Sequence, residues 1–369
     1  MRWLFWLCFL GIAYAYLGYA LLLWVQSRLR TRSVAQAVLE PAVSVVIAAR
    51  NEAANLEAKL ESLSRLEYPK DKLEIVIVSD GSTDGTAQFL KDHSYELAGV
   101  ILDRSHGKAN ALNQAVKRST GEILVFLDAR QSVDPQAIRN LVQCFADPEV
   151  GAVSGELLLE DSTGKGSSEG LGIYWRIEKL VRKLESASGS VVGVTGAIYA
   201  LRRELYDEIP AGTILDDVYV PMQVALRRKR VIFEPTAIAR DRLFGEKGKE
   251  FSRKVRTLTG NYQLLRLAPW LLTPANPLLF RFVSHKLMRL LVPLLLIVMF
   301  VASARVHTPF YRTVFCLQAA FYALAACGML VPRAKKLPPV AIANTFVMLN
   351  AAAALAFYNF ITGKKSVWV

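Results

Sequence analysis

The chain has 369 residues, which is enough for roughly two to three domains of average size. Hydrophobic residues make up 53% of it and charged residues 21%, so it is neither a disordered chain nor a pure membrane channel. The 45 lysines and arginines exceed the 32 aspartates and glutamates, giving a net charge of +13. That balance suits nucleic acid, anionic lipid headgroups or a phosphorylated substrate, and does not by itself choose among them.

The four cysteines, Cys8, Cys144, Cys316 and Cys327, are far apart and show no CxxC spacing. Neither a disulfide framework nor a zinc site is therefore expected. Three of the four lie in apolar runs, where a thiol usually packs as a small hydrophobic group.

The first apolar run extends from Trp3 to Val25 without a charged residue and can cross the ~30 Å hydrocarbon core as a helix. A cleaved signal peptide is the alternative, because Ala13-Tyr14-Ala15 resembles a cleavage site. The run continues ten residues beyond Ala15, which favours an uncleaved anchor. Residues 1–27 are expected to form an N-terminal transmembrane helix.

Residues 42–260 read differently, because short apolar runs alternate with polar, helix-like segments. The predicted strands are 43–49, 73–79, 100–102 and 123–127. The predicted helices are 56–66, 86–93, 109–118 and 135–145. This alternation predicts an α/β fold with a mostly parallel sheet covered on both faces. An amphipathic helix is further predicted over 173–184, on the sheet or the membrane.

Three apolar runs near the end, 287–304, 313–331 and 341–361, each approach the ~20 residues that a spanning helix needs. Residues 286–369 are therefore expected to form a transmembrane region with three spans. The preceding residues, 261–285, mix a tryptophan, prolines and isolated arginines, which predicts segments along the membrane surface.

Two basic clusters flank the predicted spans: Arg28, Arg30 and Arg32 follow the first, and Arg333, Lys335 and Lys336 lie between the last two. Positive charge in short loops marks the cytoplasmic side. With four spans, both clusters and the 42–260 domain lie on that side. We expect an integral membrane protein, in the bacterial inner membrane, whose folded domain is cytoplasmic.

Polar residues follow the first two predicted strands. The first strand ends in Ala49-Arg50-Asn51-Glu52, and the second in Asp80-Gly81-Ser82-Thr83-Asp84-Gly85-Thr86. Ligands of open parallel sheets bind beyond the carboxyl ends of the strands, so these residues are placed to hold a nucleotide. The alternative is that they only cap helices and form turns.

The next helix opens with Gly107-Lys108. A lysine at a helix N-terminus faces the unfavourable end of the dipole, which makes sense if an anion such as a diphosphate binds there. A solvated surface lysine is the alternative. The fourth strand ends in Asp128-Ala129-Arg130, where an aspartate can ligate Mg²⁺ or Mn²⁺ bridging a diphosphate.

With these motifs in order, the chain resembles the membrane-bound glycosyltransferase family 2 enzymes, relatives of the cellulose and hyaluronan synthases. The resemblance rests on VSVVIAARNE, IVIVSDGSTDGT, GKANALN and FLDAR, followed by GVTGAIYALRRELY and LDDVYVPMQVALRRKRVIFEP, and covers about residues 42–260. It implies the GT-A fold, which is Rossmann-like, and a metal-dependent inverting transfer of sugar from a nucleotide-diphosphate donor.

The resemblance also implies roles for residues that match the motifs. On the donor side it places Asp80 at the nucleobase, Asp84 as support of the nucleotide pocket and Lys108 at the phosphates. Asp128 matches the first aspartate of the DxD metal motif. The other donor-side residues are Ala49, Arg50, Glu52 and Arg130.

On the acceptor side, the resemblance implies that Asp217 is the catalytic base, with Asp216 and Gly196 beside it. An inverting transfer needs one carboxylate that takes the proton of the acceptor hydroxyl. The leaving diphosphate needs positive charge, which Arg253 and Arg256 can supply. A basic stretch lying on anionic lipid is the other interpretation of these two arginines.

The sequence departs from the family pattern at two places. Arg130 stands where the DxD motif has its second carboxylate, and can contact phosphate directly or form a structural ion pair. Metal dependence, on Mg²⁺ or Mn²⁺, is expected. The Q-x-x-R-W motif of processive synthases is absent, which favours limited transfer over chain building.

The sequence thus predicts a transferase moving sugar from a nucleotide-diphosphate donor, expected to be a UDP-sugar, to a lipid or glycan acceptor at the bilayer, with or without membrane partner proteins. A processive polysaccharide synthase stays open. So does a non-catalytic nucleotide-binding membrane scaffold, which Arg130 alone supports. A nucleic-acid partner is not expected, because the positive charge gathers beside the spans and no nucleic-acid-binding motif occurs.

Overall fold

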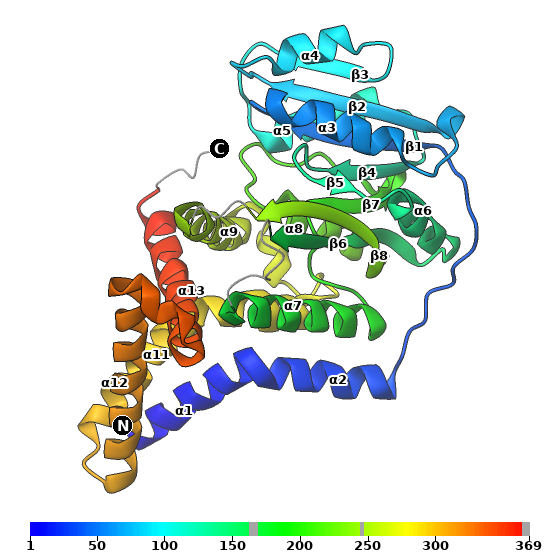
Figure 1. Cartoon of the computed structure of the whole chain (residues 1–369). Coiled ribbons are helices and arrows are strands. Elements are labelled where there is room, and N and C mark those ends of the chain that lie inside the picture. The colour runs from blue at the N-terminus through cyan, green and yellow to red at the C-terminus, as the bar shows by residue number, and fades with distance from the viewer. Residues whose placement is uncertain (162–168, 244–246, 364–369) are drawn as a thin grey trace.

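The computed structural model describes residues 1–161, 169–243 and 247–363. Its centre is an eight-stranded sheet with the order β3-β2-β1-β4-β7-β6-β8-β5 (Figure 1). The strands are β1 Val43–Ala49, β2 Leu73–Asp80, β3 Ala98–Leu102, β4 Ile123–Leu127, β5 Ser132–Val133, β6 Val150–Asp161, β7 Ile198–Arg202 and β8 Arg230–Leu243.

The half of the sheet formed by β3, β2, β1 and β4 is parallel. Val46 of β1 pairs with Val76 of β2 on one side and with Phe126 of β4 on the other. All seven residues of β1 are buried, as expected for a strand covered on both faces. These four strands were predicted, and their carboxyl ends share one edge of the sheet.

The other half of the sheet is mixed. β7 runs antiparallel between β4 and β6, β6 and β8 pair in parallel, and β5 pairs antiparallel with β8. The expectation of a mostly parallel sheet is confirmed, but the sequence pattern beyond residue 146 predicted none of β6, β7 and β8. β6 and β8 carry charged residues among apolar ones, which obscures the apolar pattern, and β7 is only five residues long.

Helices cover both faces of the sheet. On one face, α3 (Ala53–Ser64), α4 (Thr86–Asp92) and α6 (Ala137–Val142) supply Leu56, Leu90 and Ile138 to the core. On the other face, α5 (Lys108–Arg118) and α8 (Asp216–Leu226) pack against the sheet. The predicted helices of this region are confirmed to within a few residues at each end.

Two longer helices connect the sheet to the apolar helices. α7 (Glu169–Ala187) includes the predicted 173–184 helix and lies between the sheet and the N-terminal helix (Figure 1). α9 (Lys247–Leu267) is continuous, so the boundary predicted at 260–261 falls inside a helix. The 3₁₀ turn Pro269–Leu272 and the short helix α10 (Leu279–Phe282) follow.

Four helices in the described part of the chain are long and apolar enough to cross a membrane: Arg2–Leu29, Leu279–Arg305, Pro309–Leu330 and Pro338–Ile361. The first contains α1 (Arg2–Ala13) and α2 (Tyr19–Leu29), and the second contains α10 and α11 (Met288–Arg305). α12 and α13 form the other two. All four predicted apolar runs are therefore helical.

The apolar helices are in contact with the sheet domain. The rings of Phe357 and Phe360, near the end of α13, lie 5.4 and 5.6 Å from the ring of Tyr262 on α9. The Tyr262 hydroxyl also donates a 3.4 Å hydrogen bond to the carbonyl of Leu290 on α11. The end of α13 thus lies beside the sheet domain, as Figure 1 shows.

Candidate active site

The loops that follow β1 and β2 are joined by hydrogen bonds. Asn51 Oδ1 accepts a 2.8 Å hydrogen bond from the Thr83 amide, and the Ala53 amide donates a 3.1 Å bond to Asp84 Oδ2. Asn51 adopts a φ of 56°, a conformation that asparagine tolerates better than most residues. The two polar motifs therefore form one structural unit at the edge of the sheet.

The other predicted donor-side residues of the first motif lie at the same edge. Ala49 is the fully buried last residue of β1, and Arg50 follows it half-buried. Glu52 precedes the first turn of α3, and its Oε2 accepts a 2.5 Å hydrogen bond from Asn55 Nδ2. The Glu52 side chain thus bonds within the first turn of the helix that it precedes.

Asp84 holds the loop before α4. Its Oδ1 accepts hydrogen bonds from the Thr86 amide at 2.9 Å and the Thr86 hydroxyl at 2.5 Å. Burial alone would raise the pKa of Asp84, but these bonds and the bond from Ala53 outweigh it and lower the pKa below its ordinary value. Asp84 therefore stays charged and fixes the loop geometry.

Asp80, the last residue of β2, is fully buried, and its carboxylate organises the loop before α5. It accepts hydrogen bonds from Ser105 Oγ at 2.7 Å, the His106 amide at 2.8 Å and the Gly107 amide at 2.9 Å. Three protein donors therefore already occupy the carboxylate that the motif placed at the nucleobase. Asp80 thus holds the loop before α5 in place, and its contact with a nucleobase stays a prediction.

Lys108, the first residue of α5, joins two of the predicted motifs. Its Nζ lies 3.1 Å from Asp128 Oδ1 and 3.4 Å from Asp216 Oδ2. Burial would lower the pKa of Lys108, but the negative charges of Asp128, Asp216 and Asp217 raise it above its ordinary value. A permanently charged ammonium therefore connects the predicted donor side with the predicted acceptor side.

Asp216 and Asp217 begin α8, where the helix dipole favours negative charge. Burial, and then the charge of Asp216, raise the pKa of Asp217 to about 6, against the opposing charges of Lys108 and Lys286. Among the described residues, the buried Oδ1 of Asp217 has no hydrogen-bond partner. Asp217 is thus ionised near neutral pH and has an acceptor atom available.

Gly196 leaves the space beside this carboxylate open. A Cβ at position 196 would stand 3.6 Å from Oδ2 of Asp217. The neighbouring backbone is fixed by a 2.8 Å hydrogen bond from the Val194 amide to the Asp217 carbonyl and by a 2.9 Å bond from the Thr195 amide to Ser154 Oγ. The predicted acceptor-side residues Gly196, Asp216 and Asp217 are therefore neighbours in space.

Tyr199 on β7 is a site residue that the sequence analysis missed. Its ring stacks on Phe126 with centroids 4.6 Å apart, and its buried hydroxyl has no hydrogen-bond partner among the described residues. Burial, and the charges of Asp216, Asp217 and Asp128, raise its pKa well above the ordinary value. A buried hydroxyl without a hydrogen-bond partner is unusual in a folded protein, which makes Tyr199 a candidate for contact with a bound water or ligand.

Arg130 forms an ion pair. Its Nε donates a 3.1 Å hydrogen bond to Asp241 Oδ1 on β8, and its Nη2 contacts Oδ2. Gln131 Nε2 adds a 3.1 Å hydrogen bond to the same carboxylate. Of the two roles open to Arg130 from the sequence, the structure contains the ion pair.

Lys59 on α3 lies behind this motif and was also missed. It is only 2% exposed, and its Nζ donates a 2.8 Å hydrogen bond to the carbonyl of Gln131. Burial lowers the pKa of Lys59 to about 7, against the charge of Asp128. No sequence signal distinguishes this lysine from the exposed ones, because α3 carries only a weak apolar face.

Comparison with known proteins identifies the domain that carries this site. Residues 44–210 match the family model for glycosyl transferase family 2. The chain carries a glycosyl transferase family 2 domain. The matched range contains all four predicted parallel strands and the donor-side residues, and it ends just before Asp216 and Asp217.

Two curated relatives extend the similarity of the family 2 domain. The chain is 26% identical over 236 residues to the poly-beta-1,6-N-acetyl-D-glucosamine synthase of Staphylococcus epidermidis, covering 62% of this chain and 56% of that protein. The synthase of the same name from Staphylococcus aureus strain COL is 26% identical over 230 residues, covering 60% and 55%. The chain spans about half the length of these relatives.

A solved structure supports the same fold for the whole chain. The mannosyltransferase PcManGT from Pyrobaculum calidifontis, in complex with GDP-Man and Mn²⁺, superposes with a TM-score of 0.74 and 24% identity. The match covers 98% of this chain and 99% of that one, so it includes the apolar helices as well as the family 2 domain.

The family 2 domain offers one carboxylate to a divalent metal. The part of the chain that the structure describes contains no group of three or more metal-ligating side chains. Asp128, however, keeps a side chain that is 37% exposed, with Lys108 bonded to one oxygen. Mg²⁺ is commonly held by one or two carboxylates together with substrate phosphates, and Asp128 fits that arrangement.

α9 carries a further residue that supports the segment before Asp216 and that the sequence motifs did not indicate. Gln263 Nε2 donates a 2.8 Å hydrogen bond to the Gly212 carbonyl, and Gln263 Oε1 accepts a 2.9 Å bond from the Ile214 amide. Residues 263–266 read Q-x-x-R, followed by Leu267, so the Q-x-x-R-W motif lacks only its tryptophan. Gln263 thereby fixes the segment that leads into Asp216.

The two arginines predicted at the diphosphate also lie on α9. Arg253 is exposed and Arg256 is half-buried. They lie about one and two turns before Gly260, where a Cβ would stand 2.6 Å from Leu215. Their helix thus packs tightly against the segment before Asp216, while their contact with a diphosphate stays a prediction.

Proposed function

We propose that this protein is a membrane-bound, inverting glycosyltransferase that moves a sugar from a nucleotide-diphosphate donor to a lipid or glycan acceptor at the membrane. The observation that carries the proposal is the cluster of Asp128, Lys108, Asp216 and Asp217. A charged lysine there joins the predicted phosphate site to a buried pair of carboxylates.

Asp217 is the proposed base. Its raised pKa of about 6 makes it a stronger proton acceptor than an ordinary aspartate while leaving it ionised at pH 7. It takes the proton of the acceptor hydroxyl as that oxygen attacks the anomeric carbon from the side opposite the diphosphate. Gly196 keeps the approach to its carboxylate clear of a side chain.

Lys108 is the proposed partner of the leaving diphosphate. Its ammonium stands at the N-terminus of α5, where positive charge stabilises the negative charge that develops on the leaving oxygen. Asp128 would hold a divalent metal, Mg²⁺ or Mn²⁺, which when bound neutralises further phosphate charge. Arg253 and Arg256 are proposed to reach the diphosphate from α9.

The donor side is proposed to be formed by the joined loops after β1 and β2. Asp80 and Asp84 hold these loops in place, so their substitution would disturb nucleotide binding even without direct contact. A UDP-sugar is the proposed donor, and the polymer named in the two staphylococcal relatives contains N-acetylglucosamine. GDP-mannose is the donor in the structure that superposes, so both belong in the test.

The four apolar helices support a location in the membrane. We propose the bacterial inner membrane, with the family 2 domain on the cytoplasmic side, because two clusters of arginine and lysine flank the spans. Membrane partner proteins that supply or receive the glycan are compatible with this location.

Limited transfer is proposed over chain building, because Leu267 replaces the tryptophan of the processive motif. The names of the relatives favour the second candidate, a polysaccharide synthase. Product length decides between them: a ladder or a long polymer on a sizing gel would overturn limited transfer.

The test of the proposed function is release of nucleotide diphosphate by the full chain in detergent, with membrane lipid extract and a panel of UDP-, GDP- and dTDP-sugars. Asp217→Asn is the matched variant, and EDTA tests the metal. We expect release from one donor that Asp217→Asn abolishes. Nucleotide binding without release in any condition would favour a non-catalytic scaffold instead.

A further inference from the structure

The second apolar helix contains a π-helical turn at Val283–Leu287, directly beside the family 2 domain. Such turns are rare inside helices and often occur at functional sites, because the extra residue redirects side chains. Here the turn carries His285 and Lys286, with Arg281 before it and Arg289 after it, at the start of a helix whose remainder is strongly apolar.

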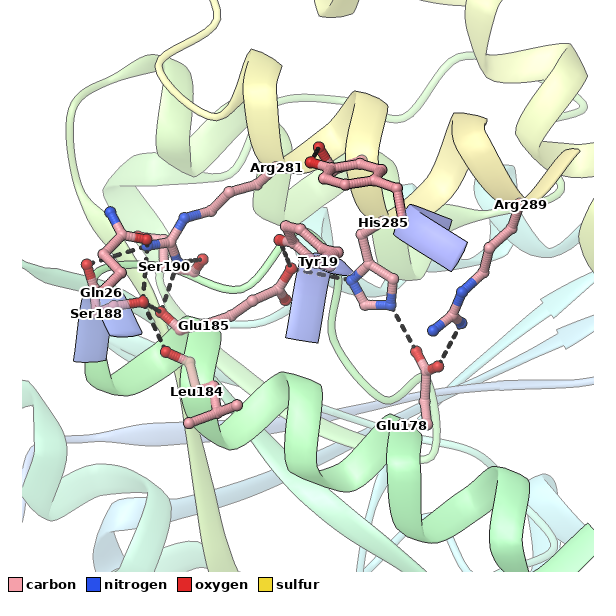
Figure 2. Close-up of polar contacts among 12 residues, drawn as sticks. Tyr19, Gln26, Glu178, Leu184, Glu185, Ser188, Ser190, Arg281, His285 and Arg289 are labelled. Carbon is pink, nitrogen blue, oxygen red and sulfur yellow. Dashed lines mark hydrogen bonds and ion pairs between the residues drawn. The ribbon is translucent and has the colours of Figure 1, made fainter. Parts of the chain in front are cut away.

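His285 anchors this turn to α7. It is 3% exposed, and its Nδ1 lies 3.0 Å from Glu185 Oε1 while its Nε2 lies 2.9 Å from Glu178 Oε1 (Figure 2). Burial would raise the pKa of both glutamates, but His285 and nearby arginines lower it, so both are ionised. The imidazole is therefore held between two carboxylates.

Further bonds strengthen the anchor. Arg289 Nη1 donates a 2.6 Å hydrogen bond to Glu178 Oε2, and the Tyr19 hydroxyl donates a 2.6 Å bond to Glu185 Oε1. These side chains come from α2, α7 and the second apolar helix, and Figure 2 shows them converging. These bonds attach the turn to α7 and to the N-terminal helix, so the backbone that carries the neighbouring Lys286 is fixed beside the family 2 domain.

Lys286 extends toward the start of α8. A Cβ at Gly193 would stand 3.8 Å from Lys286 Nζ and 3.4 Å from the carbonyl oxygen of Asp217. The charge of Lys286 lowers the pKa of Asp217, and it also lowers that of Glu178. The ammonium thus lies near the backbone of Asp217, at the start of the helix that carries the proposed base.

The charges around Asp217 explain what this ammonium does. Asp216 on the same helix and Asp128 after β4 oppose ionisation of Asp217, and Tyr199 lies near all three. Lys108 counters them but is already bonded to Asp128 and Asp216. Lys286 is a second cation acting on the carboxylate of Asp217.

We propose that Lys286, presented by a membrane helix and oriented through His285, is a positioning residue of the active site that keeps the carboxylate of Asp217 ionised and in place for proton transfer. The inference rests on the proposed function. Binding of an anionic acceptor is the weaker interpretation, because the negative charge of Asp217 already acts on Lys286.

The test is the pH dependence of sugar transfer by the full chain in detergent, for the wild type, Lys286→Met and Lys286→Arg. Without the cation, the acidic limb of the profile should move to higher pH by about one unit, which is about a tenfold loss of activity on that limb. The donor KM should stay unchanged, and Lys286→Arg should restore the wild-type profile. Arg305→Met, an exposed cation at the other end of the same helix, should also match the wild type.

An acidic limb that does not shift in Lys286→Met would overturn the proposal. So would a loss of activity that is equal at every pH and is the same in Lys286→Arg as in Lys286→Met. If Lys286→Met is not recovered in folded form, Lys286→Gln carries the same expectation. Failure of both uncharged variants to fold would make Lys286 a structural residue only. If the wild type itself transfers no sugar from any donor, the proposed function fails rather than this inference.

Discussion

Lys59 Nζ donates a 2.8 Å hydrogen bond to the carbonyl oxygen of Gln131, and so a buried lysine supports the loop that carries Asp128 and Arg130. Burying an ammonium with one carbonyl partner costs free energy unless the group loses its proton. Burial lowers the pKa of Lys59 to about 7, because the folded protein favours the uncharged amine over the ammonium.

Lys59→Met is expected to change the pH dependence of stability. Between about pH 7 and 10.5 the unfolded wild type binds more protons at this lysine than the folded one, so its free energy of unfolding rises with pH. Lys59→Met should lose that rise and be the more stable protein near pH 7, by an amount on the order of a few kcal/mol. Thermal unfolding in detergent from pH 6.5 to 10 measures this, and parallel curves for the two proteins would contradict it.

Lys108→Met should abolish most sugar transfer. Without the ammonium, Asp128, Asp216 and Asp217 repel one another and the proposed diphosphate loses its cation, so we expect a loss of roughly 10²–10³-fold. Lys117→Met is the matched control on the same helix, because its ion pair with Glu208 is exposed at 2.8 Å. Steady-state rates compare the two, and similar small losses in both would remove Lys108 from the site.

Asp217→Asn should separate stability from activity. The raised pKa of Asp217 means that the folded protein binds this proton more tightly than the unfolded one, so stability falls as pH rises from about 4 through about 6. The asparagine variant should therefore unfold at a higher temperature than the wild type at pH 7, while losing transfer. Calorimetry gives the unfolding temperature and a transfer assay on the same preparation gives the activity. An asparagine variant less stable than the wild type at pH 7 would refute the claim that the ionised Asp217 costs the folded protein stability.

Arg130→Met should destabilise the protein, because it removes the cation that pairs with the buried carboxylate of Asp241. Among the described residues, the amide of Gln131 would then be the remaining side-chain hydrogen-bond donor to that carboxylate. We expect roughly 2 kcal/mol, below the value for a fully buried pair since Arg130 is about one third exposed. Adding Asp241→Leu should recover most of that loss. If the double variant is no more stable than Arg130→Met in denaturant unfolding, the pair is not the cause.

The sequence predicted the parallel half of the fold because each strand there is a continuous apolar run buried on both faces. It did not predict β6 and β8, whose charged residues, such as Glu156 and Asp241, interrupt the apolar pattern. The domain boundary expected after residue 260, placed from the change in composition beyond it, falls inside the continuous helix α9.

The site was predicted in part. Motif order identified Lys108, Asp128, Asp216 and Asp217, and these four meet in space. The partner of Arg130 lies 111 residues away in sequence, and a long-range pair of this kind leaves no local pattern. The same holds for Tyr199, whose hydroxyl gains significance only from the carboxylates that folding brings near it.

The hydrogen bonds of Arg281 limit which acceptors can react. Its Nη1 donates to the carbonyls of Glu185 and Ser190 at 2.6 and 2.7 Å, and its Nη2 to that of Ser188 at 3.0 Å. These bonds clamp the second apolar helix to the end of α7, so the family 2 domain cannot pivot above the bilayer without breaking them. With the domain fixed in this way, the acceptor hydroxyl for the proposed base Asp217 would have to lie at a set distance from the membrane. Acceptors lengthened by a rigid spacer should become poor substrates, whatever their chemistry.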